Sequence, residues 1–205
     1  QVYVDGVYFM SQNRQVCPTD AVQLPGGYNL DNACAAMSAV AMTFPGIPLE
    51  MYYHGLRSFT GLPHRLKRVA EKSSVTYYDD SIATTPGSAI AAIGAFTQPK
   101  VLILGGHDKG GDYTALAKEI ARSNMRAVIL MGSNAEKIAQ TIYSVAPQAN
   151  LIVKGKVPMA EIVRTAATTA QAGDVVILCP AAASFDQFAS YNDRGDQFVA
   201  AVQAL

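Results

Sequence analysis

The chain has 205 residues, and its 16 basic and 16 acidic side chains give a formal net charge of zero. This balance excludes a broad electrostatic attraction to nucleic acid or to an anionic membrane surface. The three cysteines, Cys17, Cys34 and Cys179, are far apart and form no C-x-x-C pair, which argues against a disulfide framework and a zinc site. No apolar run approaches the ~20 residues that a membrane-spanning helix needs. We therefore expect a cytoplasmic protein whose partners are small molecules. We also expect a monomer.

The first sixty residues predict a hairpin followed by two helices. Residues 2–9 alternate in polarity around an Asp-Gly pair, which is typical of two-residue hairpin turns, and little further strand is expected before residue 25. The alanine-rich segment 30–44 predicts a helix with Asn29 as its N-cap. A second helix is expected over 48–58.

The middle of the chain predicts a second hairpin and a helix. Its strands are expected over 66–70 and 75–78, and the helix over 86–96. The segment 97–99 is the predicted domain boundary, because strands and helices alternate only after it.

From residue 100 onward the predicted order is βαβαβαβα, with connections long enough for a parallel sheet. The expected strands are 100–104, 126–131, 150–153 and 174–179, and the expected helices are 113–123, 134–145, 158–171 and 193–204.

A glycine-rich loop after the first of these strands is the strongest candidate for a ligand site. Residues 105–112 contain four glycines, a lysine, a histidine and two aspartates, and Asp112 or Thr114 is the expected cap of the next helix. Such a loop exposes backbone N–H groups and the positive end of a helix to an anion, and Lys109 adds a positive charge. A tight turn without a ligand is the alternative, because the spacing matches neither G-x-x-x-x-G-K-[ST] nor G-x-G-x-x-G.

Several separated stretches are more informative together than singly. They are residues 27–33 (GYNLDNA), 59–65 (FTGLPHR) with 79–86 (DDSIATTP), and 180–188 (PAAASFDQF) followed by 191–198 (YNDRGDQF). In this order they resemble the Mur ligases, and most closely the branch of that family that adds D-glutamate. The resemblance covers nearly the whole chain, and its most specific part is the last stretch together with GGHDK at 105–109.

The resemblance implies an α/β fold with two parts. Residues 1–97 resemble the C-terminal portion of the family's central ATP-binding domain, as an α+β remnant, and residues 98–205 resemble the Rossmann-like C-terminal domain that binds the amino acid. The family's phosphate loop and N-terminal UDP-binding domain are not in this sequence. Because the chain also starts at Gln1 rather than at Met, we expect a piece of a longer polypeptide that is inactive alone.

The implied reaction joins D-glutamate to UDP-N-acetylmuramoyl-L-alanine in peptidoglycan precursor synthesis. The γ-phosphate of ATP passes to the carboxylate of the UDP substrate, and the amine of D-glutamate then attacks the acyl phosphate. The implied cofactors are ATP and Mg²⁺, with the metal bound mainly by the part of the central domain outside this sequence. Such chemistry needs charge neutralisation and alignment more than a protein nucleophile.

The resemblance assigns four residues to the nucleotide. Asn29 and Asn32 match the asparagine pair that lies against adenine, where an amide both donates and accepts. Arg65 matches the arginine that reaches the ATP phosphates, for which a planar guanidinium is suited. Asp80 matches the aspartate near the ribose. Helix capping by Asn29 is compatible with this role.

Five residues match positions near the amino acid. Thr84, Lys109, Ser184 and Phe185 match positions that receive D-glutamate. Lys109, the implied catalytic residue, would pair with a carboxylate, which Ser184 and the backbone N–H of Phe185 would also hold. Tyr191 matches an aromatic position beside that pocket, with core packing as its alternative role.

Some residues depart from the family pattern and put the amino-acid specificity in question. Ile82 stands where lysine is common, Tyr28 where histidine is usual, and Lys67 where glutamate is usual. His54 and His107 have no paired ligand in the sequence, so we expect no metal role for either.

Other functions fit parts of the sequence. A second hypothesis is a Mur-type or folylpolyglutamate synthase-like ligase for another amino acid. A third is a nicotinamide-binding oxidoreductase domain, although residues 131–133 (MGS) lack the acidic residue expected after its second strand. A fourth is a non-catalytic interaction module.

Overall fold

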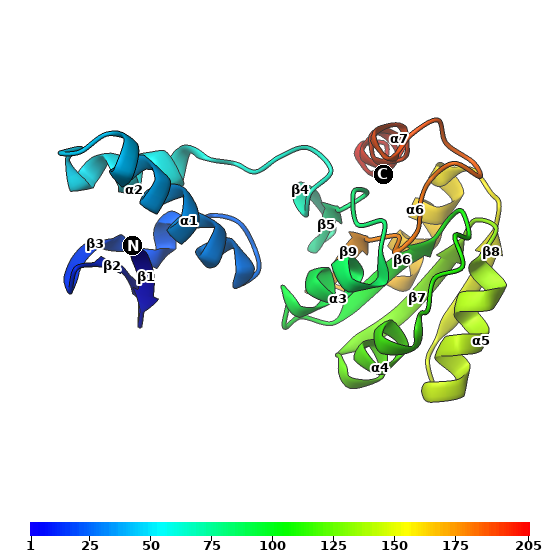
Figure 1. Cartoon of the computed structure of the whole chain (residues 1–205). Helices are drawn as coiled ribbons and strands as arrows, with labels where there is room; N and C mark the ends of the chain where they lie inside the picture. Colours follow the sequence, from blue (N-terminus) through cyan, green and yellow to red (C-terminus); the bar gives the residue numbers. More distant parts are fainter. The chain divides into compact units, whose positions relative to one another are not determined.

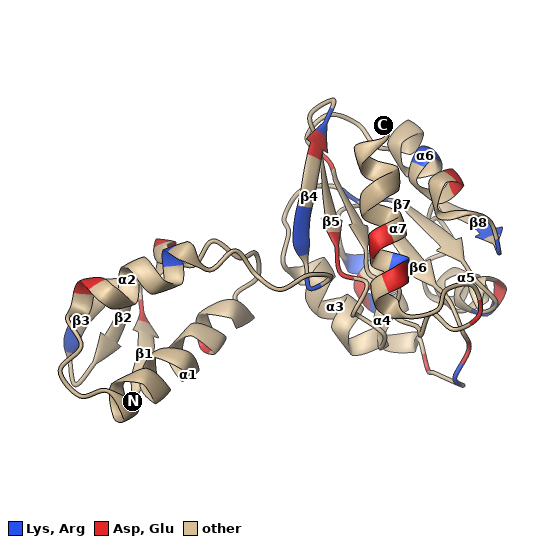
Figure 2. Ribbon diagram, turned by 90° about the horizontal axis from the view of Figure 1, so that it is seen from above, with Lys and Arg blue, Asp and Glu red and all other residues tan.

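The computed structural model describes residues 1–205, which form two compact units, Gln1–Gly61 and Leu62–Leu205 (Figure 1). None of the helices combines the length and the apolar character that crossing a membrane would need. Basic and acidic positions are interspersed over the elements of both units (Figure 2).

The first unit is a small antiparallel sheet with strand order β1-β2-β3, packed against two helices. Its elements are β1 (Val2–Asp5), β2 (Tyr8–Ser11), β3 (Arg14–Pro18), the 3₁₀ helix η1 (Thr19–Ala21), α1 (Tyr28–Thr43) and α2 (Leu49–Ser58). Phe9, Ala33 and Met37 are buried at its centre. The first hairpin and the two helices were predicted correctly.

The third strand of this sheet was not predicted. β3 follows β2 through Gln12 and Asn13, whose φ angles of +49° and +60° are those of a tight hairpin turn. Only Cys17 of β3 is fully buried, and its other side chains are partly or fully exposed. The strand therefore lacks the apolar alternation by which strands are found in a sequence.

The start of α1 also differs from the prediction. Gly27, not Asn29, occupies the N-cap position. The Asn29 side chain lies in the first turn, where its Nδ2 donates to the carbonyl oxygen of Pro25 at 2.8 Å. Its amide thus holds the chain that enters the helix instead of capping a backbone N–H.

The second unit contains a six-stranded sheet of order β4-β5-β9-β6-β7-β8. Its strands are β4 (Lys67–Lys72), β5 (Val75–Asp79), β6 (Lys100–Gly105), β7 (Met125–Met131), β8 (Leu151–Gly155) and β9 (Val175–Leu178). Its helices are α3 (Pro86–Gly94), α4 (Thr114–Arg122), α5 (Ala135–Val145), α6 (Met159–Thr169) and α7 (Tyr191–Gln203). All neighbouring strands are parallel except the β4–β5 pair. The parallel sheet predicted after residue 100 is confirmed.

Helices cover both faces of this sheet. Helices α6 and α7 lie on one face and α3, α4 and α5 on the other (Figure 1). Ile103, Ile129 and Leu178 belong to the core cluster that includes residues of α6 and α7, and the alternate residues Leu102 and Leu104 are also fully buried. Burial on both faces explains the continuous apolar runs of β6, β7 and β9.

The domain boundary predicted at 97–99 is not where the compact units meet. The structure divides the chain earlier, between Gly61 and Leu62. The reason is strand pairing across the predicted boundary: β5 pairs in parallel with β9, in the register Tyr77↔Val176. Propensity places β4 and β5 in a local hairpin but does not show which sheet the hairpin joins.

The strand order places a topological switch point between β6 and β9. The chain leaves β6 for α4 on one face, and it leaves the neighbouring β9 for α7 on the opposite face. Adjacent parallel strands whose connections diverge in this way mark the topological switch point at which open α/β sheets bind ligands.

Candidate functional site

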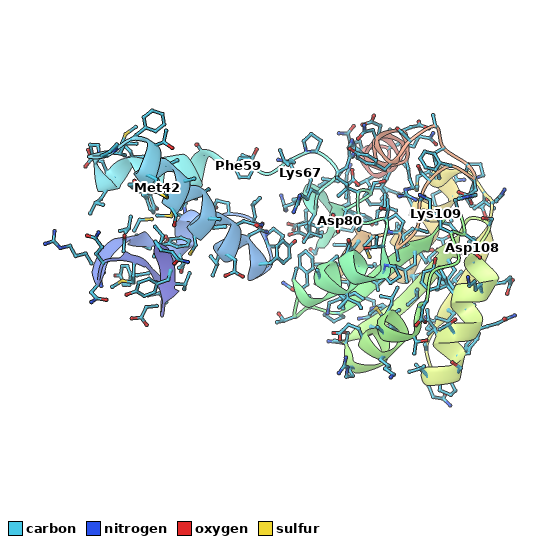
Figure 3. All side chains as sticks on the ribbon, in the orientation of Figure 1. Met42, Phe59, Lys67, Asp80, Asp108 and Lys109 are labelled. Atoms are coloured by element: carbon cyan, nitrogen blue, oxygen red, sulfur yellow. The ribbon has the colours of Figure 1, made fainter.

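Three loops meet at the carboxyl ends of β5, β9 and β6. Asp80 follows β5, and Asp108 and Lys109 lie in the loop after β6 (Figure 3). The loops after β6 and β9 are joined directly, because the His107 N–H donates to the Ala183 carbonyl oxygen at 2.8 Å. The loop after β9 is tied to the loop after β5 by a second backbone bond, from Ala181 N–H to the Ala83 carbonyl oxygen at 2.8 Å.

The glycines at the end of β6 allow this close approach. A Cβ on Gly106 would lie 2.2 Å from the Ala183 carbonyl oxygen, so only glycine fits there. The Gly106 N–H donates to the Oδ1 of Asn134 at 2.8 Å, and the Nδ2 of Asn134 donates to the Tyr113 hydroxyl at 2.8 Å. The buried Asn134 therefore fixes the base of the glycine loop against the start of α4.

Lys109 lies exposed in this loop, close to the loop after β9. Its Nζ is 5.5 Å from the ring centroid of Phe185, a cation–π distance. The neighbouring Asp108 accepts the Gly110 N–H at 2.9 Å and pairs with Lys137 at 3.1 Å, and both contacts lower the pKa of its carboxyl group. Asp108 is thus paired with another cation.

Ser184 and Phe185 begin a tight turn after β9. The Ser184 carbonyl oxygen accepts N–H groups from Gln187 at 3.2 Å and Phe188 at 2.9 Å. Ser184 itself is only 2% exposed, whereas Phe185 is 65% exposed. The turn therefore presents the Phe185 side chain, and the structure brings Lys109 and Phe185 together.

The segment around Arg65 is held on both sides while its side chain is exposed. His64 and Leu66 have φ angles of +58° and +44°, which are unfavourable for residues with a side chain. The His64 Nδ1 lies 2.7 Å from Asp79 Oδ2, and the Leu66 N–H donates to Asp80 Oδ1 at 2.9 Å. Paired carboxyl groups at the end of β5 thus fix the backbone from which Arg65 projects.

Burial perturbs both of these carboxyl groups. It raises the pKa of Asp79, an effect that hydrogen bonding to His64 opposes. Burial also raises the pKa of Asp80 to about 6, with the Leu66 N–H lowering it, the Asp79 charge raising it and Arg65 lowering it. Asp80 in turn adds to the raised pKa of the buried Cys179 thiol. Asp80 is therefore about half ionised near pH 6 and becomes fully ionised only well above that pH.

Asp80→Asn should change the pH dependence of stability. Because the pKa of Asp80 is higher in the folded chain than the ordinary 3.8, the native state binds more protons than the unfolded state between about pH 4 and pH 6. The free energy of unfolding should fall as the pH rises through this window, by at most about 3 kcal/mol from this group. Urea titrations measure the free energy of unfolding of both proteins at pH 4 and pH 7. The value for Asp80→Asn, relative to that of the unchanged chain, should be higher at pH 7 than at pH 4. The exposed Asp31→Asn is the control, and an equal difference at both pH values for Asp80→Asn would contradict the expectation.

Thr84 lies in the loop after β5, and the Tyr191 carbonyl oxygen accepts a hydrogen bond from Ser81 Oγ of that loop at 2.7 Å. The Thr84 N–H donates to the Ile82 carbonyl oxygen at 2.7 Å, and Thr84 is half-buried. The Tyr191 ring meets the His64 ring edge-on, with centroids 6.3 Å apart. In this structure, then, Tyr191 contacts the segment that holds Arg65.

Asn29 and Asn32 lie in the first unit and form a pair of their own. Asn32 Nδ2 donates to Asn29 Oδ1 at 3.2 Å, and Asn32 is the exposed member. A hollow in the same unit lies between β1 and α1, and neither asparagine lines it. Its lining residues are Gln1, Val2, Tyr3, Val4, Ser11, Gln12, Asp31, Cys34, Ala35, Ser38, Ala41 and Met42.

The sequence analysis missed the residues that hold these loops in place. Arg194 is completely buried, and Asp186 Oδ2 accepts the Ser133 N–H at 2.7 Å at the start of α5. The burial of Arg194 and the bond of Asp186 to Ser133 cannot be read from neighbouring residues, because the groups involved are far apart in the sequence. Asp186 and Arg194 lie in the stretches 180–188 and 191–198 that carry the family resemblance, and a basic residue in the first turn of a helix, where cations are unfavourable, is a further hint for Arg194.

The residues present do not make a metal site. No group of three or more His, Cys, Asp and Glu side chains in the chain is arranged to hold a metal ion. These residues therefore do not supply a Mg²⁺ site by themselves, and we assign them no step that passes through the metal.

Comparison with known families decides what kind of protein carries this site. Residues 64–182 match the family described as Mur ligase, glutamate ligase domain, and this match covers more than half of the chain. The chain belongs to the Mur ligase family. The matched residues begin at His64, close to the start of the second compact unit.

Relatives in the Mur ligase family match along almost all of the chain. The UDP-N-acetylmuramoylalanine–D-glutamate ligase of Nitrosomonas europaea is 37% identical over 199 residues, which are 97% of this chain and 41% of that protein. The ligase of the same name from Pseudomonas fluorescens is 41% identical over 202 residues, 97% of this chain and 43% of that protein. The chain therefore spans less than half the length of these relatives.

Solved structures of the family and its neighbours share the fold. UDP-N-acetylmuramate-alanine ligase from Thermotoga maritima matches with a TM-score of 0.63 and 15% identity, over 89% of this chain and 39% of that one. Folylpolyglutamate synthase from Mycobacterium tuberculosis matches with a TM-score of 0.64 and 15% identity, over 97% of this chain and 47% of that one.

Proposed function

We propose that this chain is part of an ATP-dependent ligase that joins D-glutamate to UDP-N-acetylmuramoyl-L-alanine in peptidoglycan precursor synthesis. The observation that carries the proposal is the junction of Lys109 with the loop of Ser184 and Phe185, in a chain 37% to 41% identical to ligases of that name. We place the reaction in the cytoplasm, where the free thiols Cys17, Cys34 and Cys179 would stay reduced.

In this proposal the second unit receives the amino acid at the switch point between β6 and β9. The Lys109 ammonium pairs with a carboxylate of D-glutamate, and the Ser184–Phe185 turn holds a carboxylate with its hydroxyl and backbone N–H groups. Thr84 contributes its hydroxyl, and Tyr191 borders the site. Attraction by Lys109 supports a substrate that carries a net negative charge.

In the same proposal four residues of this chain contact the nucleotide. Asn29 and Asn32 recognise the adenine edge, and Asp80 accepts a ribose hydroxyl. Arg65 neutralises phosphate charge, which suits a guanidinium whose backbone is fixed by the bonds of His64 and Leu66. Residues 1–97 would then be the C-terminal portion of the central ATP-binding domain, and residues 98–205 the amino-acid-binding domain.

The reaction needs alignment of three substrates. The carboxylate of the UDP substrate takes the γ-phosphoryl group of ATP and releases ADP. The amine of D-glutamate then attacks the acyl carbon, phosphate leaves, and the amine loses a proton as the amide forms. This chain's residues contribute orientation of the amino acid and neutralisation of charge, which are the main sources of rate in such transfers.

An amino-acid panel tests the proposal in the protein expressed from its complete reading frame. Phosphate release should require UDP-N-acetylmuramoyl-L-alanine and D-glutamate together, and should not occur with L-glutamate, L-lysine or meso-diaminopimelate. Preference for another amino acid would overturn the substrate assignment and favour a ligase of different specificity. The exposed Ile82, which stands where lysine is common in the family, is the residue that motivates this alternative. ATP consumption that depends on none of them would overturn the ligase assignment.

A further inference from the structure

Arg194 is a buried charge on which two of the site loops meet. It lies in the first turn of α7 and is 0% exposed. Its Nε and Nη2 donate to the Oγ and the carbonyl oxygen of Ser81 at 3.0 and 2.8 Å, and its Nη1 donates to the carbonyl oxygen of Ala182 at 3.0 Å. One guanidinium thus joins the loop after β5 to the loop after β9.

The third loop of the site rests on the same group. A Cβ on Gly106 would lie 3.1 Å from Arg194 Nη1, so the base of the Lys109 loop lies directly against the guanidinium. Ser81 Oγ also donates to the Tyr191 carbonyl oxygen at 2.7 Å. Gly195 allows α7 to lie close to His64, because a Cβ on this residue would be 2.2 Å from His64 Nδ1.

The geometry of these contacts explains why the residue is an arginine. Its partners are two carbonyl oxygens and one hydroxyl on two different loops, and a planar fork of N–H groups reaches them at once, whereas a lysine has a single nitrogen. Burial lowers the pKa of Arg194 to about 10, which the charges of Asp186 and Asp79 oppose, so it still carries its charge at neutral pH. Burying a charged group costs free energy unless its N–H donors form hydrogen bonds, as those of Arg194 do here.

We propose that Arg194 is a positioning residue that holds the Asp80 loop and the Ser184 loop in one fixed arrangement beside the Lys109 loop. The functional half of this statement rests on the proposed function, because Asp80 faces the nucleotide and Ser184 the amino acid only in that scheme. Loss of the Arg194 contacts should therefore disturb both subsites together, although Arg194 touches neither substrate.

The first experiment tests the structural half in the 205-residue chain and needs no activity. Ser81→Ala removes one hydroxyl and keeps both carbonyl acceptors, Arg194→Lys keeps the charge, and Arg194→Met removes both charge and donors. Hydrogen exchange followed by mass spectrometry should quicken about tenfold in residues 80–84 and 181–188 of each variant that folds, but not in α4. The control is Arg122→Met, whose side chain is 74% exposed on α4.

The second experiment tests the functional half in the enzyme from the complete reading frame. At a temperature where each variant is folded, Ser81→Ala and Arg194→Lys should raise the KM for D-glutamate and the KM for ATP together, each about three- to tenfold. Arg194→Lys should retain more activity than Arg194→Met. A residue that only stabilised the fold would lower the melting temperature and leave both KM values unchanged.

Each outcome has a defined meaning. Faster exchange in one loop alone, or in neither, overturns the proposal whatever the enzyme does. Faster exchange in both loops with unchanged KM values in an active enzyme also overturns it. An unaltered enzyme that lacks D-glutamate-dependent turnover overturns the proposed function, while faster exchange in both loops still supports the structural role of Arg194.

Discussion

Lys109→Ala should raise the KM for D-glutamate by about 10- to 100-fold and change the KM for ATP far less. A hydrogen-bonded ion pair with a carboxylate contributes about 1.5 to 3 kcal/mol, and this is the interaction that the variant removes. Lys109 suits the role because its side chain is exposed while its loop is anchored on the β9 side by the His107–Ala183 bond. Steady-state kinetics of the complete enzyme, with the UDP substrate saturating, measures both constants.

A matched control removes the same charge from a neighbouring surface. Lys118 is an exposed residue of α4, and Lys118→Ala should leave the KM for D-glutamate unchanged. Equal increases of the two KM values in Lys109→Ala would show that the lysine does not recognise the amino acid specifically. Lys109→Arg, which keeps the charge, should recover part of the lost affinity.

Gly106→Ala should destabilise the second unit by roughly 3 to 5 kcal/mol and lower its melting temperature by roughly 10 °C. Gly106 has φ +154°, and a Cβ there would lie 2.2 Å from the Ala183 carbonyl oxygen, a backbone atom that cannot move aside alone. Relief of this clash has to separate the loops after β6 and β9. The variant should therefore lose D-glutamate binding as well as stability, which thermal unfolding and calorimetric titration of the complete enzyme would measure.

The same substitution at a roomy glycine separates the clash from the general effect of adding a methyl group. Gly87 lies in α3, and nothing lies within 4 Å of a Cβ there. Gly87→Ala should be neutral or stabilise the protein by up to about 1 kcal/mol, since alanine is the better helix former. If Gly106→Ala melted like Gly87→Ala, the close approach of the two loops would not exist in solution.

The pattern of apolar and polar residues along the chain was sufficient to predict an element where that pattern records which faces of the element are buried. The strands and helices after residue 100 were predicted to within two residues at either end, because their apolar runs and helical stripes record burial on fixed faces. β3 was missed because its burial is slight, and its pairing depends on a turn at Gln12 and Asn13 that no glycine or proline marks. The compact units divide at Gly61–Leu62 and not at 97–99, because the pairing of β5 with β9 joins residues about a hundred positions apart.

Some features of the candidate site could be predicted from the sequence, and others are visible only in the folded chain. The glycine loop and Lys109 stand out in the sequence by residue type, because backbone N–H groups and a lysine ammonium suit an anion. Ser184 and Phe185 were assigned only through the resemblance to the Mur ligases. That His107 bonds to Ala183, that His64 and Asp79 brace Arg65, and that Arg194 bridges Ser81 and Ala182 are facts of the folded chain.

The sequence by itself determined the α/β class, the order of the elements after residue 100 and the loop with the most ligand-like composition. Only the tertiary structure decided that the loops after β5, β6 and β9 lie together, and that a buried arginine holds two of them. The physical reason is that periodicity and residue type act over a few neighbours along the chain. Parallel strand pairing and buried hydrogen bonds, by contrast, join segments that are far apart in the sequence, and no local sequence pattern shows that such segments are in contact.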